Sequence, residues 1–167
     1  RVHPAVHGFE RKRSILTNAK PHARKAVVIR IDLRDFFPAT RTDRLEKYFR
    51  HCGWNRSAAG LLVKLCCHEN GLPQGAPTSP RLANVVNYGL DMALAKLAGK
   101  HGAVYTRYAD DLTFSLALDD RAKAHALVRG VKLICAGAGY AIHHQKKLRI
   151  RRGHQRQLVT GLVVNHK

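Results

Sequence analysis

Acidic residues are scarce in this chain of 167 residues: 11 Asp and Glu stand against 30 Lys and Arg, which gives a formal net charge of +19. The basic residues are interleaved with apolar ones along the whole chain and do not form the block that is typical of a basic tail. A surface of this kind attracts polyanions, and nucleic acid is the simplest of them. A merely solvated basic surface is the alternative.

Cysteine is sparse too: the four residues form no CxxC pair, so the sequence predicts neither a zinc site nor a disulfide framework. No stretch comes near the ~20 apolar residues that a membrane-spanning helix needs, and there is no signal-peptide pattern. We therefore expect a cytoplasmic protein with no membrane partner. The sequence starts at Arg1 and not at a methionine, which indicates a piece of a longer protein.

Hydrophobic residues make up 45% of the sequence, enough for one compact domain with a buried core. Their spacing shows the periods of both strands and helices. The predicted elements are, in chain order, a strand at Val27–Leu33, helices at Thr42–His51 (capped by Thr42) and Arg56–Cys67, a long helix from Arg81 to about Gly99, two strands in Val104–Ser115, a helix over 124–134, and a terminal hairpin of Lys147–Arg152 and Gln157–Val164. This order indicates an α+β fold in which helices back a mainly antiparallel sheet.

Three aspartates lie at the ends of these predicted strands: Asp32, Asp110 and Asp111. In a regular strand neighbouring side chains point to opposite faces, so Asp110 and Asp111 can serve one site only if the chain turns there. Carboxylates that lie close together repel one another unless a cation holds them. Oxygen ligands of this type suit Mg²⁺, with Mn²⁺ as a possible substitute, and we expect two such ions. An Asp-Asp pair on its own is also common in turns and at helix N-termini.

Four motifs contain or surround these aspartates. They are Tyr108–Asp111 (YADD), Ile31–Pro38 (IDLRDFFP), Leu72–Pro80 (LPQGAPTSP) and Gly139–Ile142 (GYAI) followed by Lys146. The first resembles the YxDD box of reverse transcriptases, the second resembles their first aspartate motif, and the third resembles their QGxxxSP box. The fourth is similar to the family motif in which a lysine approaches the triphosphate. The resemblance extends from about His7 to Asn165.

Two shorter motifs resemble the bacterial retron group of this family. Asn18–His22 (NAKPH) matches its NAxxH signature, and Val159–Gly161 matches its VTG triplet. From the residues alone, the first is equally a hydrogen-bonded turn and the second a strand entering a turn. The QGAPTSP sequence also favours retrons, because group II intron enzymes more often carry a second glycine after the first. A group II intron-like or other defence reverse transcriptase is the alternative within the family.

The resemblance implies a right-hand polymerase palm, with a ferredoxin-like antiparallel sheet backed by helices. Within a single reverse transcriptase domain, it implies partial fingers at 1–26, a palm at 27–150 with a finger insertion at about 41–70, and the start of the thumb at 151–167. The implied activity is RNA-directed DNA polymerase, in which two metal ions assist transfer from deoxynucleoside triphosphates (dNTPs) to a primer hydroxyl.

The partners that the resemblance implies are an RNA template and primer, nascent DNA and, in a retron, an effector protein. A retron enzyme would make RNA-linked single-stranded DNA in phage defence. A non-catalytic module that binds structured RNA is the alternative if the fragment lacks activity.

The resemblance also implies residue roles. The metal ligands would be Asp32, Asp110 and Asp111, and Lys146 would be a further catalytic residue that assists the leaving pyrophosphate. The nucleotide-binding residues would be Arg13, Phe37, Gln74, Gly75 and Tyr108, and the RNA-binding residues would be Asn18, His22, Val159, Thr160 and Gly161.

Some of these roles have plain structural alternatives. The Phe37 ring would exclude a ribonucleotide 2′-hydroxyl while Phe36 enters the core, but from sequence alone Phe37 is equally a core residue. Gln74 could be a polar loop residue and Lys146 one more surface lysine. We expect Asp35 and Asp91 to be structural.

Overall fold

The computed structural model describes residues 1–143 and 148–165. Its centre is a four-stranded antiparallel sheet in the order β2-β3-β1-β4. The strands are β1 (Val27–Asp32), β2 (Ala103–Tyr108), β3 (Asp111–Leu116) and β4 (Arg149–Arg152). Together with the helix before β2 and the helix after β3, they follow the β-α-β-β-α-β order of the ferredoxin-like motif. The α+β class expected from the sequence is confirmed.

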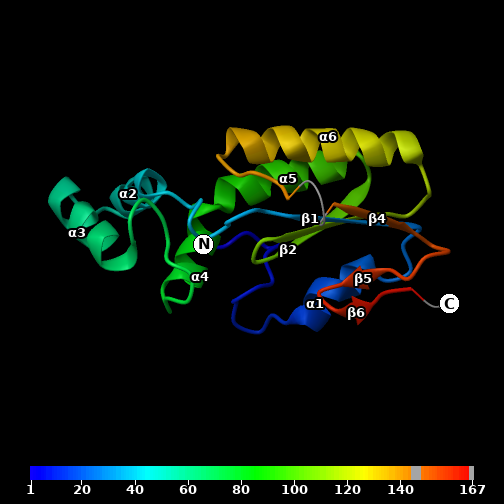
Figure 1. The fold of residues 1–167 in the computed structure, drawn as a ribbon, viewed down its shortest axis with the longest axis horizontal. Helices are drawn as coiled ribbons and strands as arrows, with labels where there is room; N and C mark the ends of the chain where they lie inside the picture. The colour runs from blue at the N-terminus through cyan, green and yellow to red at the C-terminus, as the bar shows by residue number, and fades with distance from the viewer. Residues whose placement is uncertain (144–147, 166–167) are drawn as a thin grey trace.

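Two helices cover one face of this sheet, α5 (Tyr88–Lys100) and α6 (Arg121–Gly137) (Figure 1). The alternate residues Ile29 and Ile31 of β1 are fully buried beneath them and belong to the same core cluster as Leu127 of α6. Because side chains alternate along a strand, the remaining residues of β1 lie on the opposite face, away from these helices.

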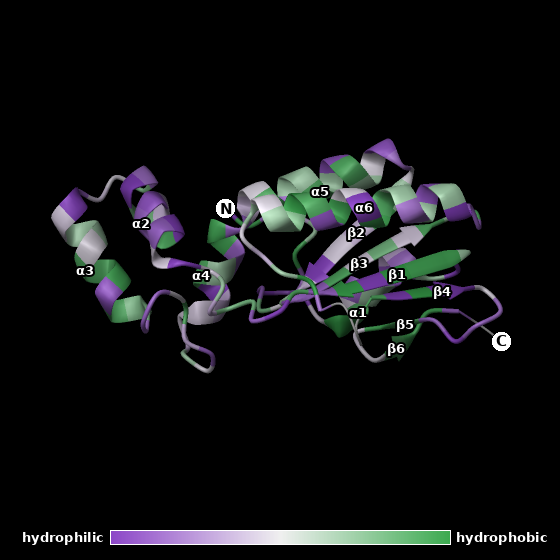
Figure 2. Cartoon of the chain, turned by 45° about the horizontal axis from the view of Figure 1, so that its top comes forward, coloured by the Kyte–Doolittle hydropathy of each residue, from purple (hydrophilic) through white to green (hydrophobic). Residues whose placement is uncertain are grey.

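That opposite face is covered only in part (Figure 1). The elements on it are α1 (Ile15–Ala19), the 3-10 turn η1 (Lys20–His22), β5 (Leu158–Val159) and β6 (Leu162–Val163). A small second core joins them to the sheet, made of Ala19, Val28, Val159 and Val164. Figure 2 shows β4 as a largely hydrophilic strand beside this partly open face.

The terminal hairpin predicted from the sequence is wrong. Arg149–Arg152 pairs with β1 as the edge strand of the main sheet, with Ile150 packed against the main core. The β5 and β6 strands form a separate hairpin, because Thr160 and Gly161 both take positive φ, +45° and +84°, and so close a two-residue turn.

The helices α2 (Thr42–His51) and α3 (Arg56–Cys66) pair beside one end of the sheet (Figure 1). Both were expected, but Thr42 is the first residue of α2 and not its cap. The capping position belongs to Arg41, whose side chain makes no cap hydrogen bond. Asn55 caps α3 by accepting a hydrogen bond from the Ala58 amide.

The long helix predicted from Arg81 to Gly99 is two helices, α4 (Ser79–Val86) and α5. They meet at Asn87, which is fully buried. The Asn87 amide donates to the Ala83 carbonyl and to the Tyr140 hydroxyl, and its oxygen accepts from Arg44. These side-chain bonds compete with regular helix geometry, which explains the break. No helix in the described ranges has the length and hydropathy that a membrane crossing requires.

Candidate active site

The β2–β3 hairpin turns within the YADD sequence. Tyr108 pairs with Asp111, so Ala109 and Asp110 form the two-residue turn, and Ala109 takes a φ of +54°. A non-glycine residue in this region costs about 1 kcal/mol or more, so the surroundings have to hold it there. The turn that Asp110 and Asp111 need if they are to serve one site is therefore present.

Three contacts hold this turn from different sides. Its Ala109 carbonyl accepts from Arg107 Nη1 at 3.1 Å, and its Asp110 carbonyl accepts from the Leu33 amide at 3.0 Å. Gly8 lies so close that a Cβ there would be 2.7 Å from the Ala109 nitrogen. Because such a contact is closer than real Cβ atoms approach, only glycine fits at position 8 without displacing the turn.

The turn brings the aspartates to one end of the sheet. Asp32, the last residue of β1, lies directly opposite Asp111 in the antiparallel register, and Asp110 precedes Asp111 in the turn. Directly opposed residues have Cα atoms ~4.5–5.5 Å apart, within reach of a shared cation. Asp32 is 8% exposed. The three carboxylates predicted to act together are thus carried by adjacent backbone positions.

The Asp111 side chain is engaged by a neighbour. Its Oδ2 lies 2.6 Å from Nη2 of Arg30, which is two residues before Asp32 on β1. As the side chains stand, the described residues contain no group of three His, Cys, Asp or Glu that converges on a metal position. The donor set fits Mg²⁺ in chemistry and backbone placement, and Arg30 engages only the Oδ2 atom of Asp111.

An open cleft lies in front of these groups. It has a volume of about 320 Å³ and is lined by Arg30, Asp32, Asp111 and Arg149. It therefore offers carboxylate oxygens beside two guanidinium groups, a combination suited to a cation and a phosphate together.

A buried ion pair supports the turn from the helix side. Arg107 is fully buried, and its Nε and Nη2 each lie 2.7 Å from the Asp91 carboxylate of α5. Tyr105 also donates to Asp91, at 2.8 Å. Burial, followed by the charge of Asp91, raises the pKa of Tyr105 well above its usual value. The structural role expected for Asp91 is confirmed.

Arg107 was not predicted from the sequence, although one signal was available. Its position in β2 has the same parity as buried Tyr105, so a charged residue there points into the core and needs a buried partner. Burial lowers the pKa of Arg107, but the charge and hydrogen bonds of Asp91 outweigh it and raise the pKa.

The two phenylalanines after Asp32 lie in different environments. Phe36 is 4% exposed and stacks on Tyr140 at 5.6 Å between ring centroids, whereas Phe37 is half-buried. Phe37 lies 6.3 Å from the ring of Phe9, and Phe9 lies 6.3 Å from Tyr108 of the turn. A row of rings therefore leads from Phe37 to the YADD turn, and Phe9, half exposed, was missed from the sequence.

The loop that contains Gln74 and Gly75 contacts the first aspartate motif, Ile31–Pro38. Leu72 donates to the Phe37 carbonyl at 3.3 Å, and a Cβ on Gly71 would lie 2.0 Å from the Pro38 carbonyl oxygen. Gln74 and Gly75 are exposed at the tip of this loop, and Gly75 has a φ of +94°.

The GYAI segment lies along the same motif. Its Ala141 carbonyl accepts from the Arg34 amide at 2.8 Å, and the His143 amide donates to the Asp32 carbonyl at 3.1 Å. Lys146, expected near the pyrophosphate, lies outside the described residues.

Two remaining predicted residues lie on the surface. Arg13 is exposed and lines a separate cavity with His7 and Thr17, which none of the three aspartates borders. The carboxylate of Asp35 is exposed and pairs with Arg34 at 3.3 Å. The structure therefore does not bring Arg13 together with the carboxylates.

The NAxxH and VTG motifs pack on each other. Asn18 Nδ2 lies 3.4 Å from the Thr160 hydroxyl, which also donates to the Ile15 carbonyl. Gly161 is exposed beside Thr160 in the turn, whereas Asn18 and Val159 are fully buried. Direct contact of RNA with these two buried side chains requires the hairpin to move away from α1.

His22 anchors η1 beneath the sheet. It is fully buried between the hydroxyls of Ser115 and Thr106, at 2.7 and 2.8 Å from its two ring nitrogens. Burial, reinforced by the charges of His7 and Lys25, lowers the pKa of His22 to about 4. In this position His22 joins η1 to the sheet and does not face solvent.

Comparison with known proteins identifies the family to which this chain belongs. The family described as "Reverse transcriptase (RNA-dependent DNA polymerase)" matches residues 1–157. The chain belongs to the reverse transcriptase family. Reverse transcriptase relatives from retrons match nearly its whole length, which confirms the resemblance to the retron group.

Three of these relatives show how much of each sequence is matched. Retron Ec86 reverse transcriptase of Escherichia coli is 40% identical over 96% of this chain and 49% of its own length. Retron Mx162 reverse transcriptase of Myxococcus xanthus is 38% identical, over 98% of this chain and 39% of its own length. Retron Mx65 reverse transcriptase, from the same organism, is 37% identical over 98% of this chain and 42% of its own length. The chain thus spans half or less of the length of these retron reverse transcriptases.

Proposed function

We propose that this chain carries the catalytic centre of an RNA-directed DNA polymerase of the retron type, located in the bacterial cytoplasm. The observation that carries the proposal is the placement of Asp32 opposite Asp111, with Asp110 in the adjoining turn. In this assignment the four-stranded sheet with α5 and α6 is the polymerase palm. The pair α2 and α3 belongs to the fingers, and the β5–β6 hairpin begins the thumb.

Asp32, Asp110 and Asp111 would hold two Mg²⁺ ions, which Mn²⁺ could replace. When bound, the ions would activate the primer hydroxyl and neutralise the leaving pyrophosphate. Asp111 would join this site by exchanging Arg30 for a metal ion. Arg30 would then be free to pair with a nucleic-acid phosphate.

The surrounding residues would select and place the nucleotide. The Phe37 ring, supported by Phe9, would lie under the incoming sugar and exclude a 2′-hydroxyl. The exposed Gln74 amide would contact the nucleotide or template. RNA template and primer, nascent DNA and dNTPs are the partners, and an RNA-linked single-stranded DNA in phage defence, with an effector protein, is the proposed biological setting.

The test is template-directed extension of a primer on RNA by the purified protein with dNTPs and Mg²⁺. We expect Asp110→Asn to abolish extension while RNA binding and the melting temperature stay near wild type, because the change removes a ligand and not a core side chain. The matched control is Asp35→Asn, an exposed aspartate outside the cleft, which should extend normally. Wild-type extension by Asp110→Asn would contradict the proposal.

A further inference from the structure

The backbone of Phe9 is held in an unfavourable conformation. Its φ is +61°, in the left-handed region that favours glycine, and a bulky side chain rarely adopts it. Such a conformation costs free energy and persists only where the surrounding structure holds it in place. The neighbours of Phe9 therefore have to supply that hold.

Residues on both sides of Phe9 are fastened to α4. The Asn84 side chain, which is buried, donates through Nδ2 to the Gly8 carbonyl at 2.9 Å and to Glu10 Oε1 at 2.8 Å. Glu10 also forms an ion pair with Arg81, one helical turn before Asn84. A single buried amide thus fixes the residue before Phe9 and the residue after it.

The fastened segment also contacts the YADD turn. Asn84 Oδ1 accepts from Arg107 Nη1 at 3.2 Å, and this nitrogen also donates to the Ala109 carbonyl at 3.1 Å. Gly8 packs directly against the Ala109 nitrogen, where no Cβ would fit. The backbone of Phe9 is therefore held at a fixed place beside the turn.

The ring of Phe9 is not buried by these contacts. It is 52% exposed, and its centroid lies 6.3 Å from the ring centroids of both Phe37 and Tyr108. Both rings are tilted against it, at a distance over which aromatic rings attract one another. Phe9 belongs to neither hydrophobic core cluster of the described residues. The contacts that hold Phe9 therefore serve a surface position beside the site and not the core.

A ring that excludes a hydroxyl group has to resist displacement. Phe37 is only half-buried, so it is less confined than a core ring, and a change of its side-chain rotamer would make room for a 2′-hydroxyl. A neighbouring ring on a fastened backbone opposes such a change. The strained conformation of Phe9 has a purpose if it places this second ring against Phe37.

We propose that Phe9 determines sugar selection together with Phe37: the fastened Phe9 ring holds the Phe37 ring against the incoming sugar, so that a 2′-hydroxyl finds no room. Phe9 is thus a positioning residue from the segment before α1, whereas the excluding ring comes from the loop after β1. This inference rests on the proposed polymerase function and adds to it the residue that fixes the preference for deoxynucleotides.

The experiment measures kcat/KM for ribonucleotides and for deoxynucleotides in primer extension on RNA by the purified protein. In Phe9→Ala the ratio of the ribonucleotide value to the deoxynucleotide value should rise by roughly three- to tenfold, mainly because ribonucleotide use rises. Phe9→Tyr keeps a ring of the same shape and should retain the wild-type ratio. In a Phe37→Val background, Phe9→Ala should add little, because the ring that it positions is already absent.

The control is Leu133→Ala, which removes an exposed apolar side chain of α6 outside the carboxylate cleft and should leave both kcat/KM values unchanged. A loss of stability alone would lower both values and leave their ratio as it was, and thermal melting shows whether each variant is folded. Fluorine NMR with 4-fluorophenylalanine at position 37 tests the contact without any requirement for activity. Phe9→Ala should move this resonance, and Leu133→Ala should not.

The outcomes separate the two proposals. An unchanged ratio in Phe9→Ala, an equal rise in Phe9→Tyr, additive effects with Phe37→Val, or an unmoved resonance would overturn the role of Phe9, while extension by the wild-type protein upholds the polymerase function. If the wild-type protein extends the primer with neither nucleotide, the polymerase function fails and the role in selection fails with it.

Discussion

Arg107 and Asp91 form a bidentate ion pair that is fully shielded from solvent, and the third guanidinium nitrogen of Arg107 donates to the Ala109 carbonyl. The pair connects α5 to the turn that carries Asp110. The buried ion pair therefore helps to hold the Ala109–Asp110 turn in the conformation that the site needs.

We expect Asp91→Asn to lower the free energy of unfolding by about 3–5 kcal/mol, because it leaves the Arg107 charge buried without its counter-ion. Chemical denaturation measures this value. Asp35→Asn removes an exposed carboxylate of the same type and should change stability by less than about 0.5 kcal/mol. Equal effects of the two substitutions would show that the buried Arg107–Asp91 pair does not stabilise the fold as expected.

The separation of Phe36 from Phe37 makes sugar selection testable. Phe37→Val should open space for a 2′-hydroxyl, so the ratio of kcat/KM for ribonucleotides to that for deoxynucleotides should rise. Phe36→Val should instead lower stability by a few kcal/mol, because it truncates a buried ring, and leave the ratio unchanged. If Phe36→Val relaxes selection and Phe37→Val only destabilises, the assignment of the two rings is reversed.

Arg30 pairs with Asp111, and both side chains are only about a quarter exposed, so in the proposed function Arg30 would compete with a cation for this carboxylate. In the absence of nucleic acid, Arg30→Gln should tighten Mn²⁺ binding by about two- to fivefold, the equivalent of a partly exposed ion pair of ~0.5–1 kcal/mol. Electron paramagnetic resonance of free Mn²⁺ gives the affinity without any requirement for activity. Arg41→Gln, which breaks an exposed pair with Asp43, is the control and should leave the affinity unchanged. Weaker Mn²⁺ binding by Arg30→Gln would show that Arg30 assists the site and does not compete with it.

The lowered pKa of His22 predicts acid sensitivity. The folded state keeps His22 neutral down to about pH 4, whereas the unfolded chain takes up a proton near pH 6.5. The contribution of His22 to stability is therefore complete above about pH 6.5 and is lost as the pH falls towards 4, by about 3 kcal/mol in total. Urea unfolding at several pH values measures the slope of the free energy of unfolding against pH. His22→Gln should flatten it, and an unchanged slope in this variant would assign the effect to other groups.

Local patterns in the sequence predicted the parts of the fold that depend on neighbours along the chain. The strand ending at Asp32, the turn between the aspartates and the helix Thr42–His51 all follow from alternation or helical period. These features need no knowledge of distant residues, which is why a single sequence suffices for them.

Features that depend on distant partners could not be predicted in this way. Pairing of β4 with β1 brings together segments more than a hundred residues apart, and the break at Asn87 depends on Tyr140 and Arg44. The burial of Asn18 likewise depends on packing against the Thr160 turn. A short sequence motif gives no sign of whether its polar atoms face a ligand or another part of the chain.

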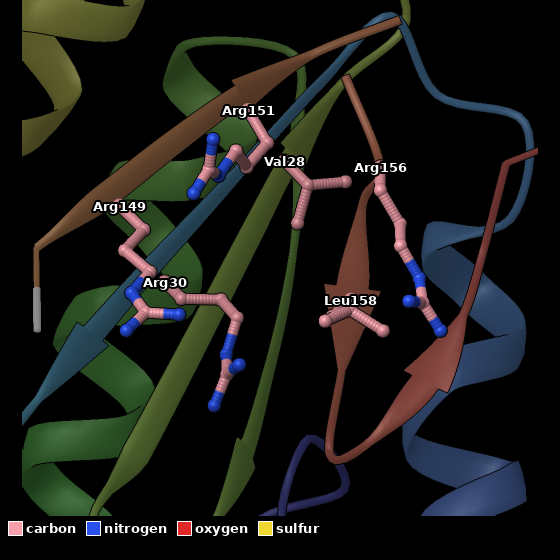
Figure 3. A pocket seen from close by; sticks show the side chains of 6 residues that line it. All are labelled: Val28, Arg30, Arg149, Arg151, Arg156 and Leu158. Carbon is pink, nitrogen blue, oxygen red and sulfur yellow. The ribbon is translucent and has the colours of Figure 1, made fainter.

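The guanidinium of Arg30 borders two cavities on the same face of the sheet, the carboxylate cleft and a cavity of about 210 Å³ that Val28 and Arg151 also line (Figure 3). In the proposed function, a nucleic-acid phosphate that pairs with Arg30 would leave Asp111 available to a cation, so binding of the strand would favour binding of the metal. Thermodynamic reciprocity would require the converse: the cation would strengthen binding of the strand by the same factor. A single arginine would thereby couple the two ligands, so that the full set of carboxylates is most available when there is a strand end to extend.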